Sequence, residues 1–459
     1  MKRTMTRTLV AGAVAAAVGG PAHALGLLDA WRSAQQADAQ YRSAKFELEG
    51  SRYVIPMARS QLLPTVSINT SDTKVNGTRE VANATTGGMD SAPLDYFSRS
   101  RALNVRAPLV NLDGWARLRM GESQVELAEA VFRLRGKELA LRMGKAYFDL
   151  LYALDSVGLA QSAVENYREA VANATRRFRG GEGTRTDVTE AESRLDIANA
   201  QLIEARDQVE VARRALQFVT GRDTVSVRPP QGELVPAPLQ PASLEAWLEK
   251  VDERSPEIVV TRRQLDVAQR DVARARAGHY PTVYALAGLS KSQNDSIVTL
   301  NQKFSQSSIG LQVTIPLYSG GYVDAAVEQS LAGVRKAEQD IEAQLAAQRV
   351  DLRRQYLAAA NGLAKIEAYS RAVRSSELAV ESTRGGVRAG LRTNLDVLDA
   401  LRQAFQARRD LAQARYQYML ALLQLKAVAG EPLDEVVGEL NRILERADAG
   451  PARAAVDRK

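Results

Sequence analysis

Residue types that usually carry enzymatic chemistry are nearly missing from this sequence. The 459-residue chain has no cysteine and two histidines, His23 and His279. Disulfides, thiolate zinc sites and a lipid-modified N-terminal cysteine are therefore excluded. Metal motifs that pair two nearby histidines are excluded as well, and no Gly-rich Walker loop is present. His279 stands at a helix-to-strand corner and is interpreted as an interfacial residue beside an aromatic girdle. We expect no enzyme activity and no cofactor.

Three aspartates remain as candidates for a charged site. Asp187, Asp396 and Asp399 stand in the first turns of two predicted helices, where carboxylates complement the helix dipole. Thr184 and Thr393 precede them as capping residues. Asp396 and Asp399 are three positions apart and therefore share one helix face. The residues alone leave two interpretations open, helix capping and a functional carboxylate cluster.

Long helices must position these aspartates. No proline occurs from Leu109 to Arg228 or from Leu317 to Glu431, so each stretch suits a helical hairpin. Continuous helical patterns run over 113–178 and 321–387, and at about 1.5 Å per residue each would reach ~100 Å. Helices of that length do not fit a compact globule.

The second helix of each predicted hairpin carries a heptad pattern. From Val188 to Val219, and again from Val397 to Val428, apolar residues recur at alternating spacings of three and four. A strict seven-residue repeat predicts a left-handed coiled coil. One heptad position is often alanine, which allows the backbones to approach closely. An ordinary two-stranded stalk would explain the heptads equally well, but it would not explain the strands.

Four strands are predicted from apolar and polar residues in alternation. They lie within 65–70, 102–107, 282–290 and 309–315, and Tyr284 and Leu286 interrupt the pattern of the third by standing on its polar face. The polar stretches between partner strands, 71–99 and 291–306, are expected to be solvent-exposed loops.

The chain contains an internal duplication. A shift of 209 residues places Gly181 on Gly390, Asp187 on Asp396 and Gly221 on Gly430, and Leu28-Asp-Ala-Trp31 matches Leu244-Glu-Ala-Trp247. We expect a signal peptide over 1–24, a first structural repeat over 25–228, a Pro-rich linker over 229–242, a second repeat over 243–440 and a flexible C-terminal tail over 441–459.

The N-terminal segment has the pattern of a secretory signal. Basic residues precede an apolar stretch and the small-residue site Ala22-His23-Ala24. Removing Lys2, Arg3 and Arg7 with it lowers the net charge from +7 to +4. The remaining balanced charge gives no reason to propose a nucleic-acid partner.

The predicted strands are too few to cross a lipid bilayer alone. The smallest closed outer-membrane barrels need about eight strands, and an open sheet edge is not tolerated in lipid. If the protein enters a bilayer, identical chains must share the barrel. The alternative is a soluble α+β protein with two exposed hairpins.

The sequence resembles TolC-type outer-membrane channels from Leu25 to about Leu440, most specifically over residues 389–400, AGLRTNLDVLDA. The resemblance implies a mainly α fold with a β-barrel contribution, built from a duplicated helix-strand-strand-helix unit. Three chains would form a homotrimer with a shared twelve-stranded barrel in outer-membrane lipid and a coiled-coil tunnel across the periplasm. Implied partners are a periplasmic adaptor and an inner-membrane ABC transporter or RND pump.

The resemblance also assigns a gate at the periplasmic end of the coiled coil. Its positions fall on Thr186, Asp187, Arg392, Asp396 and Asp399. In a trimer, Asp396 and Asp399 would form a carboxylate ring that favours cations and admits block by multivalent metal ions. Arg392 on one hairpin would face Asp187 on the other and hold the entrance shut. Val387 replaces the aromatic residue usual in the family, which puts a hydrogen bond from that position in doubt.

These implications favour a passive exit duct for type I protein secretion. The preference for protein secretion depends on the resemblance of the segment Leu27–Ala44 and on the missing lipidation cysteine. Small-molecule efflux is the alternative, and a non-conducting coiled-coil tether of the envelope is a third hypothesis. The exported substrate is not apparent from the sequence.

Overall fold

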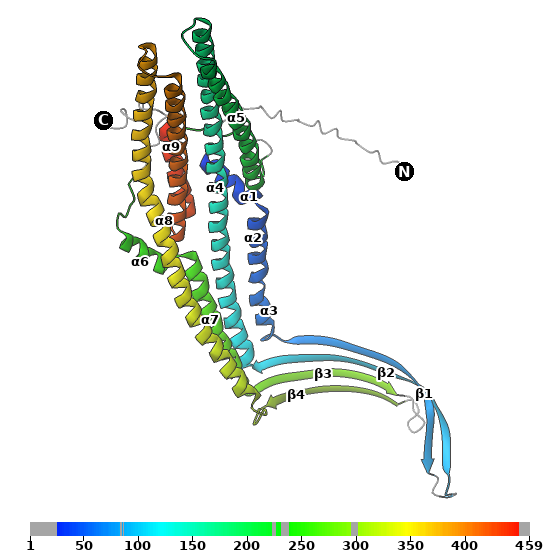
Figure 1. Ribbon diagram of the computed structural model, residues 1–459. Helices are drawn as coiled ribbons and strands as arrows, with labels where there is room; N and C mark the ends of the chain where they lie inside the picture. Colours follow the sequence, from blue (N-terminus) through cyan, green and yellow to red (C-terminus); the bar gives the residue numbers. More distant parts are fainter. Residues whose placement is uncertain are drawn as a thin grey trace, which may run out of the picture.

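The molecule is long and thin in the computed structural model. Helices run side by side along one axis, and a strongly curved sheet leaves the bundle at one end (Figure 1). The structure describes residues 25–82, 85, 87–222, 226–230, 238–294 and 302–448. The expected signal peptide lies outside these residues, as does the last part of the expected tail, 449–459. Within the described ranges, no helix combines the length and apolarity needed to cross a membrane.

The order of elements repeats once along the chain, as the internal matches predict. The first unit consists of α1 (Leu27–Ala37), α2 (Ala39–Arg52), α3 (Val54–Ser60), β1 (Thr65–Ala82), β2 (Met89–Val110), α4 (Leu112–Arg179) and α5 (Arg185–Thr220). The second consists of α6 (Leu244–Arg254), α7 (Pro256–Ala277), β3 (Thr282–Asn294), β4 (Gln302–Thr314), α8 (Tyr322–Arg388) and α9 (Asn394–Val428), followed by α10 (Leu433–Asp448).

Matching tryptophans fix the start of each unit. Trp31 is 2% exposed and its indole N–H donates to Asp434 Oδ1 at 2.6 Å. Trp247 is fully buried and donates to the Pro241 carbonyl at 2.7 Å. Both rings thus bury a large apolar surface and satisfy their one polar atom.

The two long helices have the predicted length. α4 spans 68 residues and α8 spans 67. They stay close to their neighbours because small residues lie at the contacts. A Cβ atom built on Gly144 would lie 2.3 Å from Leu423 Cδ2, and one on Gly362 would lie 2.9 Å from Tyr418 Cδ2.

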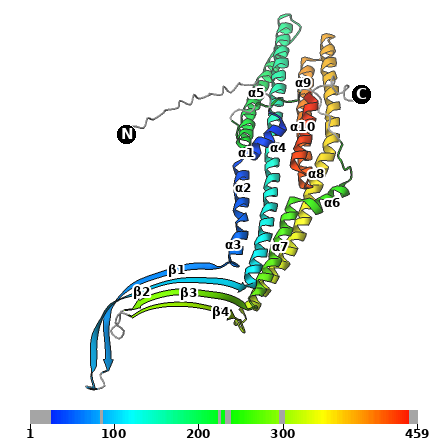
Figure 2. The same ribbon diagram turned by 180° about the vertical axis from the view of Figure 1, so that it is seen from behind.

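The main core lies in the middle of the bundle, where α1, α4, α5, α9 and α10 meet (Figure 2). α10 contributes Leu440, which is fully buried, and Leu444, which is 7% exposed. The prediction of a flexible tail from residue 441 is therefore wrong for residues 441–448. Their apolar residues lie on one helical face and pack into the core, which fixes the segment.

The sheet is antiparallel with the order β1-β2-β3-β4. Its strands are longer than predicted, and most of 71–99 and part of 291–306 are paired strand rather than loop. Main-chain pairing continues through these polar residues, since an antiparallel ladder does not require apolar side chains. Cross-strand contacts such as the 3.4 Å ion pair between Lys74 and Asp95 support the extension.

The register places apolar residues of all four strands on one face of the sheet. Val66 pairs with Val105, Val105 with Ala287, and Ala287 with Ile309. The opposite face is mostly polar. Tyr284 fits there because the Arg106 guanidinium lies 3.8 Å from the centre of its ring.

The connection between the units contains no strand in the part that the structure describes, residues 226–230 and 238–243. It is held to the bundle at several points. Leu25 N–H donates to the Ser226 carbonyl at 2.7 Å, and the Tyr356 hydroxyl donates to the Ala242 carbonyl at 2.6 Å.

Candidate functional site

The aspartates singled out by the sequence lie at the two hairpin tips. The turn between α4 and α5 and the turn between α8 and α9 are at the end of the molecule opposite the sheet, in both views (Figures 1 and 2). The α4/α5 pair is the first hairpin and the α8/α9 pair the second.

Both tips have the same backbone geometry. Gly181 and Gly390 have φ values of 76° and 74°, in the left-handed region that favours glycine. Glu182 N–H donates to the Arg177 carbonyl at 2.9 Å, and Leu391 N–H donates to the Gly386 carbonyl at 2.9 Å. These bonds close the ends of α4 and α8 in the same helix-terminating motif.

The next helix begins in each tip with a reciprocal capping box. In the first hairpin, Thr184 Oγ1 accepts from Asp187 N–H at 3.2 Å, and the Asp187 carboxylate accepts from Thr184 N–H at 2.9 Å. In the second hairpin, Thr393 Oγ1 accepts from Asp396 N–H at 3.3 Å, and the Asp396 carboxylate accepts from Thr393 N–H at 2.8 Å. Thr184 and Thr393 are therefore capping residues, as the sequence predicts, and Asp187 and Asp396 complete the two boxes.

These caps also set the charge of the two carboxylates. The backbone hydrogen bond from Thr184, followed by the bond from its hydroxyl, lowers the pKa of Asp187 below the ordinary value. Thr393 lowers the pKa of Asp396 through the same pair of bonds. Both groups are therefore ionised at neutral pH.

The structure also places Thr186 and Arg392, two further residues of the expected gate. Thr186 is exposed at the second position of α5. Arg392 Nη1 lies 3.9 Å from Asp396 Oδ1 on its own hairpin. Among the ion pairs of the described residues, none joins Arg392 to Asp187, whose carboxylate is already held by its own cap. Within one chain, the latch from Arg392 to Asp187 is not formed.

Other residues join the two hairpins. Arg194 of α5 lies 3.4 Å from Asp399 Oδ1 of α9, and Arg402 lies 3.5 Å from the same oxygen. Arg384 of α8 donates to Asn166 Oδ1 of α4 at 3.0 Å and lies 3.8 Å from Glu169. Sequence reasoning missed Arg194 and Arg384, because nothing in the local pattern separates them from other charged residues on exposed helix faces.

An apolar cluster supports these polar contacts. Ala191 and Ala198 of α5 are buried against Val397, Leu398 and Leu401 of α9, together with residues of α4. Val387, the position that departs from the family pattern, is half-buried against this cluster. It therefore contributes apolar packing to the second hairpin.

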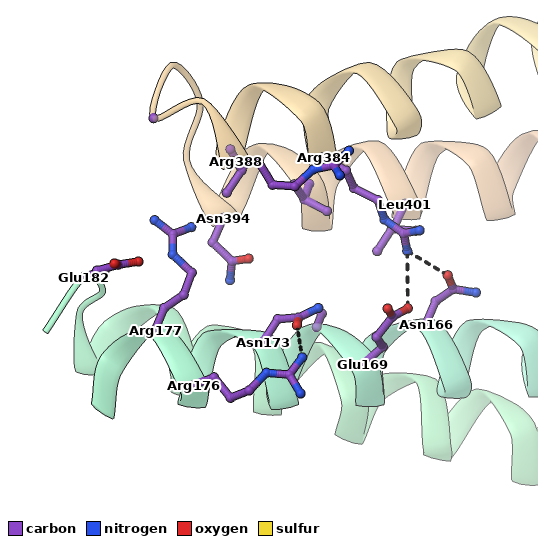
Figure 3. A pocket seen from close by; sticks show the side chains of 14 residues that line it. Asn166, Glu169, Asn173, Arg176, Arg177, Glu182, Arg384, Arg388, Asn394 and Leu401 are labelled. Atoms are coloured by element: carbon purple, nitrogen blue, oxygen red, sulfur yellow. Dashed lines mark hydrogen bonds and ion pairs between the residues drawn. The ribbon is translucent and has the colours of Figure 1, made fainter. Parts of the chain in front are cut away.

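The described residues contain no group of three or more histidines, cysteines or acidic residues close enough to hold a metal ion. A metal-blocking carboxylate ring would thus have to combine Asp396 and Asp399 from several chains. A cavity of about 860 Å³ lies between the hairpins near their tips and is lined by residues of α4, α8 and α9 (Figure 3).

The sequence matches the family model described as outer membrane efflux protein over residues 30–222 and 247–431. It is 34% identical over 419 residues to Proteases secretion protein PrtF of Dickeya chrysanthemi, covering 90% of this chain and 89% of that protein. It is also 34% identical over 442 residues to Alkaline protease secretion protein AprF of Pseudomonas aeruginosa, covering 96% and 91%.

The fold is similar to that of solved outer membrane proteins. The structure of VceC from Vibrio cholerae superposes with a TM-score of 0.74 at 18% sequence identity, covering 89% of this chain and 96% of that one. Both repeats are therefore matched by a family model, by relatives of similar length and by a solved fold.

Proposed function

The chain belongs to the outer membrane efflux protein family, and from this premise we propose that it is the exit duct of a protein secretion system, closed at its periplasmic end by the hairpin tips. It is an outer-membrane channel of the TolC type that extends into the periplasm. Its family places it among transport proteins rather than enzymes.

One observation carries the proposal: the sheet exposes an apolar face and has two free edges. Ile68 of β1 is 77% exposed, and Ile309 and Leu311 of β4 are 91% and 70% exposed. β1 and β4 each have a single neighbour in the sheet. Soluble proteins rarely expose such a face, whereas lipid would cover it if neighbouring chains paired with both edges.

Aromatic residues near the base of the sheet support a membrane boundary there. Tyr318, between β4 and α8, is 87% exposed, Tyr322, the first residue of α8, is 75% exposed, and Trp115 at the start of α4 is 54% exposed. Tyrosine and tryptophan are enriched at the membrane–water interface. The bundle then continues away from this boundary as the wall of a tunnel shared by three chains.

The names of two relatives favour protein as the exported substrate. Both are described as secretion proteins for proteases. TolC-type channels act as trimers with adaptor and inner-membrane transporter partners. For this chain we propose a periplasmic adaptor and an ABC transporter that supplies the energy, since the duct itself has no nucleotide-binding motif.

The gate assignment is part of the same proposal. Asp396 and Asp399 of three chains would surround the narrow end of the tunnel and favour cations. Thr186, Asp187 and Arg392 lie at the same two tips and would line the entrance. The lowered pKa of Asp396 favours the ionised form of this carboxylate at neutral pH.

The apolar face gives the sharpest test of the duct. Leu311 and Gln312 are neighbours on β4 and lie on opposite faces of the sheet. We expect Leu311→Lys to lose trimer and outer-membrane insertion, because a lysine facing lipid costs about 2–4 kcal/mol at the bilayer midplane. The matched variant Gln312→Lys should assemble like wild type. Membrane fractionation and trimer yield measure both.

Equal insertion of the two lysine variants would contradict a lipid-facing role for this face. Failure of both variants to insert would also count against this role, because lysine would then prevent insertion from either face of the sheet.

A further inference from the structure

Arginine is the most frequent residue type lining the cavity between the hairpins. Six charged residues line it: Arg176, Arg177, Arg384, Arg388, Glu169 and Glu182. The four cations and two anions come from α4 and its turn on one side and from α8 on the other. The cavity therefore carries a net positive charge across the gap between the two hairpins.

Two of the four arginines already have protein partners. Arg384 is held by Asn166 and Glu169, and Arg176 donates to Asn173.

Arg177 and Arg388 differ from these two. Their side chains make no hydrogen bond or ion pair with any residue of the described ranges, although Arg177 attracts Asp187 at longer range. In Figure 3, Arg177 extends from α4 toward Asn394 across the gap. One guanidinium group of each hairpin thus lines the cavity without a protein partner.

A buried amide adds an independent indication of a ligand. Asn394 Nδ2 is buried and has no hydrogen-bond partner. Asn394 lines the cavity, and its side chain points into the gap toward Arg177 and Asn173 (Figure 3). A buried donor without an acceptor is unfavourable, so an acceptor oxygen in the cavity would relieve it.

We propose that this cavity binds a small, multiply charged oxyanion with phosphate-like chemistry, held by Arg177, Arg388 and Asn394. Guanidinium groups present two N–H donors in a fork that matches two oxygens of a phosphate or carboxylate. Glu182 at the rim opposes the anion, whereas Glu169 is neutralised by Arg384.

The bound oxyanion joins the first hairpin to the second, because Arg177 belongs to α4 while Arg388 and Asn394 belong to α8 and α9. It thus acts as a removable link between the tips. Its influence on a closed channel depends on the proposed function, but the binding itself does not.

Inorganic pyrophosphate is a suitable probe, titrated calorimetrically into the purified full-length protein in detergent at fixed ionic strength. The test variant is Arg177→Gln with Arg388→Gln. The matched control is Arg168→Gln with Arg371→Gln, which removes the same charge from the same two helices at exposed residues outside the cavity. We expect saturable binding that weakens at least about tenfold in the test variant and is unchanged in the control.

A second variant keeps the charge constant. Asn394→Ala removes the buried amide, and we expect it to weaken pyrophosphate binding while leaving the arginines in place. Hydrogen exchange provides the structural readout: pyrophosphate should slow exchange at the ends of both α4 and α8 in the wild type and in the exposed-arginine control, but not in Arg177→Gln with Arg388→Gln.

Neither measurement requires the protein to conduct ions. The test of the binding site therefore remains valid even if the protein proves not to be an exit duct. Undetectable pyrophosphate binding by the wild type, or equal binding by all variants, would overturn the site. Binding that slows exchange in only one hairpin would overturn the link between them.

Discussion

At the scale of single residues, the carboxylates at the tips have different roles. Asp187 and Asp396 each complete a capping box, and their hydrogen bonds stay within one turn of helix. Asp399 instead meets Arg194 from the other hairpin at 3.4 Å. A carboxylate can cap a helix and still contribute charge to a pore, because the capped form is the ionised one.

The Asp396 cap should depend on pH. Its pKa is lower in the folded protein than the unfolded value of about 4. The stabilisation is therefore complete above that value and is lost as the pH falls through the folded pKa. We expect amide protection in the first turn of α9, measured by hydrogen exchange, to drop below about pH 4.

The Asp396→Asn variant should lack this drop and should already exchange faster at neutral pH. Asp410→Asn, in the middle of the same helix, serves as the control and should keep the wild-type profile. Identical pH profiles for all three proteins would show that the cap does not hold the turn.

The contacts between hairpins should control opening. Replacing Arg194 and Arg384 with glutamine removes the contacts to Asp399 and Glu169, each a partly exposed pair worth about 0.2–1 kcal/mol. We expect the open-to-closed ratio in bilayer recordings to rise by up to about fivefold for each pair lost.

Arg392→Gln is the matched control, because Arg392 contacts Asp396 on its own hairpin. A larger rise in the open-to-closed ratio for Arg392→Gln than for Arg194→Gln would contradict this account and support the expected latch between Arg392 and Asp187.

At the scale of elements, the duplicated units place equivalent glycines at equivalent helix ends. Gly221 after α5 and Gly430 after α9 have φ values of 64° and 73°. Both helices therefore end in the left-handed conformation that glycine adopts without steric cost. At Gly430 the space is also filled, since a Cβ atom would lie 2.1 Å from the Arg254 carbonyl oxygen.

Gly430→Ala should destabilise the protein by about 2–4 kcal/mol, from the left-handed backbone and the collision with α6 together. Thermal unfolding in detergent measures the effect. Gly438→Ala, within α10, is the control because no atom lies within 4 Å of its added methyl group. That variant should be as stable as wild type or slightly more so. Equal stability of the two alanine variants would contradict this view of the α6–α9 contact.

The sequence predicted the helices better than the strands. α4 and α8 follow the expected bounds within one residue, since their proline-free stretches end at glycine and threonine signals. The β1–β2 hairpin was predicted too short because polar strand residues have no apolar alternation. The pairing of Arg194 with Asp399 could not be predicted, since 205 positions separate them and nothing local joins them.

At the scale of the whole molecule, one chain combines a sheet with an unpaired apolar face and a bundle with its own core. The bundle buries Leu139, Met143 and Leu423 completely, whereas Ile309 on the sheet is 91% exposed. The bundle therefore has a packed core of its own, whereas the proposed function has lipid and neighbouring strands cover the sheet. This division supports the proposal that a single chain is one part of a larger channel.

Single-channel recording of the purified protein in planar bilayers, with its mass measured in detergent beforehand, tests this claim most directly. We expect a trimer that inserts and produces discrete, cation-selective conductance steps. A monomer that produces no steps would contradict the account.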